Sequence, residues 1–78
     1  MTSTELVELY IHRASRIFDA PTLESLRWRG LGAIHALHAS GLLTYAQHAV
    51  ALTLFVDTCS TRHSELTRAS DDSKGGAQ

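Results

Sequence analysis

Residues 45–66 read YAQHAVALTLFVDTCSTRHSEL, and this stretch decides the fold. Seven side chains recur at alternating steps of four and three, the heptad spacing that holds one stripe of a helix against a partner helix. The predicted core stripe comprises Tyr45, Ala49, Leu52, Val56, Cys59, His63 and Leu66. Val50 and Leu54 project about half a turn away from Leu52, so this helix requires cover on two sides.

The N-terminal sequence predicts a first helix. Thr2 followed by Glu5 is a capping box, and the helix is expected to run from there to about Phe18. Its apolar face is expected to hold Leu6, Val7, Tyr10, Ala14, Ile17 and Phe18.

A second helix is predicted over residues 21–40. Pro21 suits the first turn of a helix, and Gly41 is the expected left-handed terminator. Thr44 and Gln47 then form another capping box. The second and third helices are therefore expected to form an antiparallel hairpin with a tight turn.

The third helix is predicted to end at about Arg68. Residues 70–78 read SDDSKGGAQ, a composition that cannot bury apolar surface and is typical of disorder. The expected organisation is thus an all-α fold of three helices in one domain, residues 1–69, followed by a disordered tail, residues 70–78.

Composition narrows the classes of function. The 78 residues carry a formal net charge of -1 and one cysteine, which gives neither a basic field for nucleic acid nor an internal disulfide. No secretory signal pattern opens the sequence, and the apolar run 49–56 is far below the roughly 20 residues that span a bilayer. We expect a cytoplasmic protein that does not enter membranes.

The second helix presents an unusual outer face. Trp28 lies opposite the stripe of Leu26, Gly30, Ile34 and Leu37, between two arginines. Tryptophan and arginine are over-represented at interface hot spots, which favours a partner-binding surface; the alternative is that Trp28 packs on the first helix. The predicted partner-binding residues are Arg27, Trp28, Arg29, Leu31 and His35.

The sequence gives little support for a catalytic site or a metal site. The hairpin would bring His48 near His38, with His35 close by, yet no cysteine or acidic residue completes a zinc site at matching spacing. Cys59 and His63 share a helix face without an orienting acid or an oxyanion loop. We therefore predict no catalytic residues, no metal and no cofactor.

A DNA-binding transcriptional regulator is the alternative function. Gly41 fits the turn of a helix-turn-helix loosely, but the following helix lacks base-reading side chains. A basic patch of Arg13, Arg16, Arg27 and Arg29 around Trp28 is what such a function would use.

The N-terminal stretch ELVELYIHRASRIF, residues 5–18, belongs to a tiny all-helical chain with a polar tail. In size, helicity and style the chain resembles small accessory proteins of temperate phages. Some of these seize host proteins, including quorum-sensing activators and the ATPase that extends type IV pili. The resemblance implies an inhibitor that acts by binding, and it carries no site residues with it.

Together these observations predict a small, non-enzymatic protein that masks a surface of a host protein. The apolar back of the third helix predicts a homodimer, with Val50 and Leu54 as the self-association residues.

Overall fold

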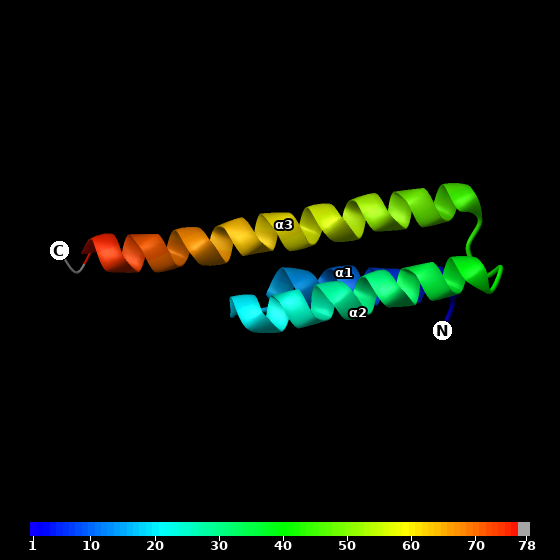
Figure 1. The fold of residues 1–78 in the computed structure, drawn as a ribbon, viewed down its shortest axis with the longest axis horizontal. Helices are drawn as coiled ribbons and strands as arrows, with labels where there is room; N and C mark the ends of the chain where they lie inside the picture. Colours follow the sequence, from blue (N-terminus) through cyan, green and yellow to red (C-terminus); the bar gives the residue numbers. More distant parts are fainter. Residues whose placement is uncertain (77–78) are drawn as a thin grey trace.

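The computed structural model describes the backbone of residues 1–76 and the side chains of residues 1–68. This described part consists of three helices and no strand: α1 (Ser3–Arg16), α2 (Ala20–Ala39) and α3 (Tyr45–Gly76). Each helix contacts both others, and α3 lies along α1 and α2 and extends past them (Figure 1). The prediction of an all-α fold with three helices is confirmed.

Side-chain caps fix where the helices begin. Thr2 Oγ1 accepts a hydrogen bond from the Glu5 amide at 3.1 Å, as the capping box predicts. Thr44 and Gln47 cap each other reciprocally at the start of α3, with N···O distances of 2.9 and 3.1 Å. Between α2 and α3, Gly41 has a φ of 78°, a conformation that costs a residue with a Cβ more than it costs glycine.

The connection between α1 and α2 corrects one prediction. Helix α1 ends at Arg16, and Ile17 has extended backbone angles. Phe18 consequently turns outward and is 86% exposed, so its expected place on the buried face of the first helix was wrong. Arg62 of α3 holds this connection, because its Nε donates to the Ile17 carbonyl oxygen at 2.6 Å.

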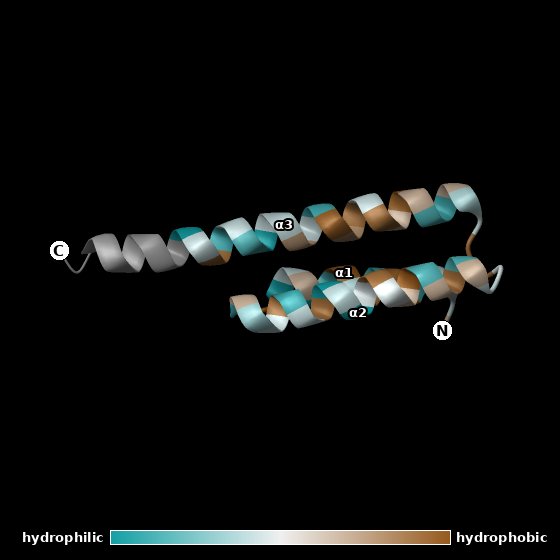
Figure 2. Cartoon of the chain, viewed as in Figure 1, coloured by the Kyte–Doolittle hydropathy of each residue, from teal (hydrophilic) through white to brown (hydrophobic). Residues whose placement is uncertain are grey.

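The core lies along the line where the three helices meet. Its largest fully buried side chains are Phe55 of α3 and Ile34 of α2. The Phe55 ring lies over Gly30, where a Cβ would come within 2.2 Å of the ring. Tyr10 of α1 meets the same ring edge-on, with centroids 6.2 Å apart. Figure 2 shows the apolar part of α3 in the segment that runs beside the other two helices.

The predicted core stripe of α3 is rotated relative to the observed one. The buried side chains are Ala51, Phe55 and Cys59, of which Cys59 was predicted, while Leu52 is only partly buried. Within the predicted stripe, Tyr45, Ala49 and His63 are exposed, whereas Val56 and Leu66 are half-buried. The observed stripe brings the Phe55 ring into the space that Gly30 leaves open on α2.

Helix α3 continues beyond the predicted end at Arg68 to Gly76. The predicted boundary between a domain, residues 1–69, and a tail, residues 70–78, stays a prediction, and residues 77–78 lie outside the described part. Within residues 1–76, none of the three helices combines the length and apolarity needed to cross a bilayer.

Candidate interaction surfaces

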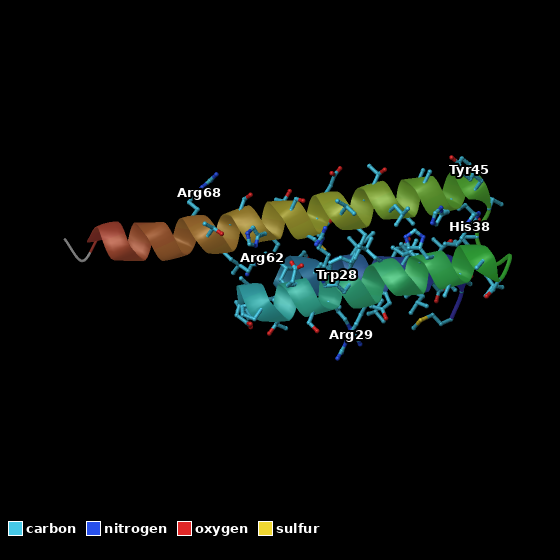
Figure 3. The ribbon with its side chains drawn as sticks, viewed as in Figure 1. Trp28, Arg29, His38, Tyr45, Arg62 and Arg68 are labelled. Carbon is cyan, nitrogen blue, oxygen red and sulfur yellow. The ribbon has the colours of Figure 1, made fainter. Side chains whose placement is uncertain are left out.

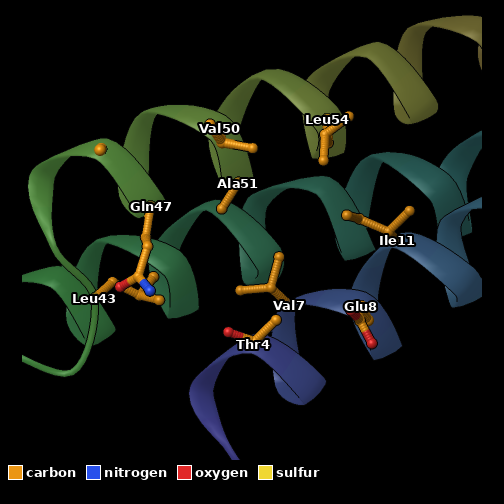
Figure 4. A pocket seen from close by; sticks show the side chains of 10 residues that line it. Thr4, Val7, Glu8, Ile11, Leu43, Gln47, Val50, Ala51 and Leu54 are labelled. Carbon is orange, nitrogen blue, oxygen red and sulfur yellow. The ribbon is translucent and has the colours of Figure 1, made fainter.

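The groove between α1 and α3 is apolar and open. It encloses a hollow of about 390 Å³, lined on α1 by Val7 and Ile11 and on α3 by Val50 and Leu54 (Figure 4). Val50 is 58% exposed and Leu54 is 51% exposed. The two predicted self-association residues therefore lie together, one turn apart, at the edge of a shared hollow.

Trp28 is an exposed aromatic side chain with polar partners on its own helix. It is 63% exposed, and its Nε1 donates to Glu24 Oε1 at 3.0 Å. The same Glu24 oxygen accepts from Arg27 Nη1 at 3.2 Å, and the Arg27 guanidinium lies 5.3 Å from the indole centroid. Two side chains of the same helix, Glu24 and Arg27, thus contact the indole without burying it.

The other predicted partner-binding residues do not form one patch with Trp28. Leu31 is half-buried and packs against the core, and His35 contacts α3. Arg29 points away from α3, whereas Trp28 lies on the α3 side of α2 (Figure 3). Residues two apart on a helix do not share a face, which explains why Arg27 and Arg29 diverge.

Three histidines meet near the turn between α2 and α3. His48 Nε2 lies 3.1 Å from His35 Nδ1, and the rings of His48 and His38 stack with centroids 4.3 Å apart. Desolvation lowers the pKa of His48, and positive charge on His38 and His35 lowers it further. No group of three or more potential ligands among residues 1–68 is arranged for a metal.

Cys59 and His63 lie beside the groove between α2 and α3. Cys59 is buried, and burial raises the pKa of its thiol, which disfavours the thiolate that a nucleophile requires. His63 is exposed, and the hydrogen bonds of the described side chains include none between the two residues.

The predicted basic patch around Trp28 is divided between two grooves. Arg13, Arg16 and Arg29 line the groove between α1 and α2, together with His12. Arg27 instead lines the groove between α2 and α3. Sequence reasoning identified all four arginines but grouped them around the wrong centre, because the packing of α1 on α2 decides which of them meet.

Comparison with known proteins gives no relatives: no family model, curated protein or solved structure matches this chain.

Proposed function

We propose that this chain is a small, non-enzymatic protein-binding module that acts in the cytoplasm by covering a surface of another protein. The observation that carries the proposal is the exposed indole of Trp28, which is hydrogen-bonded to Glu24 and covered on one side by Arg27. Contacts that favour one orientation of a side chain reduce the conformational entropy that it loses when a partner covers it. Glu24 and Arg27 supply that restraint from within α2.

The proposed partner is a host protein with an apolar pocket that accepts the indole. The neighbouring Arg27 suits such a contact, because its guanidinium lies over the indole ring. The resemblance to phage accessory proteins directs the first candidates to bacterial quorum-sensing activators and pilus-extension ATPases.

Capture from a bacterial lysate tests this proposal. The wild-type chain is expected to retain one partner at a stoichiometric level, and Trp28→Ala is expected to lose it. Leu42→Ala is the matched control, since Leu42 is 60% exposed in the turn before α3 and lies away from the indole. Retention of the same partner by Trp28→Ala at unchanged affinity, confirmed with the purified pair, would contradict the proposal. Capture of nucleic acid instead would favour the DNA-binding alternative.

We also propose that two copies pair through the groove between α1 and α3, in a dimer of antiparallel α2–α3 hairpins. One patch supplies both the projecting side chains, Val50 and Leu54, and the hollow beside Val7 and Ile11. A surface that contains its own complement is what a twofold interface requires. The pairing would cover apolar area that the single chain leaves open.

Light scattering on the purified chain tests the dimer. The wild type is expected to have twice the monomer mass, and Leu54→Glu is expected to have the monomer mass with its helical spectrum intact. Thr53→Glu is a control, because Thr53 is an exposed neighbour that does not line the groove. An unchanged mass for Leu54→Glu would show that the association surface is misplaced.

A further inference from the structure

Three arginines from two helices converge on the groove between α1 and α2. Arg13 and Arg16 come from the last turn of α1, and Arg29 comes from the middle of α2. The groove encloses a hollow of about 340 Å³, and its lining contains no carboxylate. Positive charge is therefore concentrated at one place in a chain whose formal net charge is -1.

The ion pairs within the described side chains leave these arginines out. The pairs are Arg27 with Glu24 and Arg62 with Glu65. The acidic residue next to the groove in sequence, Asp19, directs its Oδ2 to the amide and hydroxyl of Thr22 at the start of α2. The three guanidinium groups of the groove thus keep their hydrogen-bond donors for an external acceptor.

The base of the groove is apolar. Ile17 and Leu26 line it between the arginines, and both are partly buried against the core. A ligand that fits this surface needs acidic groups for the guanidinium forks and an apolar group for the base. We propose that the groove binds an acidic amphipathic segment of a partner protein, with its carboxylates on Arg13, Arg16 and Arg29 and an apolar side chain on Ile17 and Leu26.

Nucleic acid fits the same groove less well. Three arginines offer few phosphate contacts, and stable nucleic-acid binding at physiological salt usually draws on more of them. The net charge of -1 adds no long-range attraction for a polyanion. A phosphate backbone also has no apolar group that could pack on Ile17 and Leu26 at the floor of the groove.

This inference goes beyond the surfaces assigned above, because the groove lies on the side of α2 away from Trp28. The test uses the full chain and fluorescence anisotropy with a short labelled helical peptide of Glu, Leu and Ala. The matched probe has Gln in place of Glu, and a labelled DNA duplex is the third probe. We expect the Glu peptide to bind and the Gln peptide to bind far more weakly. Added salt is expected to lower the affinity for the Glu peptide.

Single variants locate the site. Arg13→Gln and Arg29→Gln are each expected to lower the affinity for the Glu peptide by up to about fivefold, the range of an exposed ion pair. The triple variant, which also carries Arg16→Gln, is expected to lower it further. Arg68→Gln removes the same charge from an exposed position on α3 and is expected to leave binding unchanged. Circular dichroism confirms that each variant is folded.

Several outcomes would overturn the inference. Equal affinity for the Glu and Gln peptides would show that charge has no role in binding. If Arg68→Gln lowers the affinity for the Glu peptide as much as the groove variants do, binding depends on the net charge of the chain and not on this groove. Arginine-dependent binding of DNA without binding of the Glu peptide would identify a nucleic-acid site instead. Trp28→Ala is expected to keep the peptide affinity, so failure of this inference and failure of the proposed function give different results.

Discussion

Replacing Gly30 by alanine tests the central packing contact of the fold. A Cβ at Gly30 would lie 2.2 Å from Phe55 Cζ and 2.5 Å from Cε2, so the ring has to move by more than an ångström. Phe55 is fully buried, so its ring is surrounded by the side chains of the core. Overpacking of this kind costs about 1–3 kcal/mol, which opposes a helix-propensity gain of about 1 kcal/mol.

Gly32 provides the matched control, two residues further along the same helix. A Cβ there meets no atom within 4 Å, so Gly32→Ala receives the propensity gain without the clash. The difference in unfolding free energy between the two variants thus isolates the packing cost, at about 1–3 kcal/mol. Urea denaturation followed by circular dichroism, at one fixed protein concentration, measures it.

The result that would refute this reasoning is equal stability of the two variants. Such a result would mean that the Phe55 ring does not lie over Gly30 and that α3 faces α2 at another angle. A further check is Phe55→Leu in the Gly30→Ala background. A smaller side chain at position 55 is expected to make the alanine less damaging, so that the two changes are not additive.

Three further predictions concern the ends and edges of the bundle. The pKa of His48 is lowered in the folded chain, so the unfolded chain takes up a proton at a higher pH than the folded chain does. The unfolding free energy is therefore expected to keep its full His48 contribution above about pH 6.5 and to fall as the pH drops through that value. Urea titrations across this range are expected to show a smaller fall for His48→Gln. Arg62→Leu leaves the Ile17 carbonyl without its donor and is expected to cost about 1–3 kcal/mol in urea unfolding, whereas Arg68→Leu as a control costs little. Thr2→Ala removes the cap of α1 and is expected to lower the unfolding free energy by about 1 kcal/mol, whereas Thr2→Ser keeps a capping hydroxyl and is expected to retain most of it. An unchanged urea midpoint for Arg62→Leu or for Thr2→Ala would contradict the contact that the variant removes.

Local sequence signals predicted the helices because their causes are local. The Thr2 cap, the capping box of Thr44 and Gln47 and the left-handed glycine at position 41 act within a few residues, and each occurs where expected. Which side of α3 is buried against α1 and α2 was not predictable from such local signals. A helix with apolar residues on two sides fits more than one stripe, and the choice depends on Gly30, which belongs to another helix.

The interaction surfaces show the same division. Spacing along one helix was sufficient to place Val50 and Leu54 on a common surface. The histidine contact between α2 and α3 was anticipated from the hairpin, although its geometry required the packed structure. The arginines of the groove between α1 and α2 were predicted to lie near one another, but they were grouped with Arg27 around Trp28, because no spacing rule relates Arg13 on one helix to Arg29 on another.

The buried position of Cys59 gives this protein an internal probe of its own motions. The chain contains one cysteine, and its thiol lies between α2 and α3 with 3% of the residue exposed. A reagent that modifies thiols can react only when the two helices separate locally or the whole chain unfolds. The rate of modification therefore measures how often that opening occurs, without any substitution or attached label. Slower modification on binding a partner would reveal that the partner clamps α2 against α3.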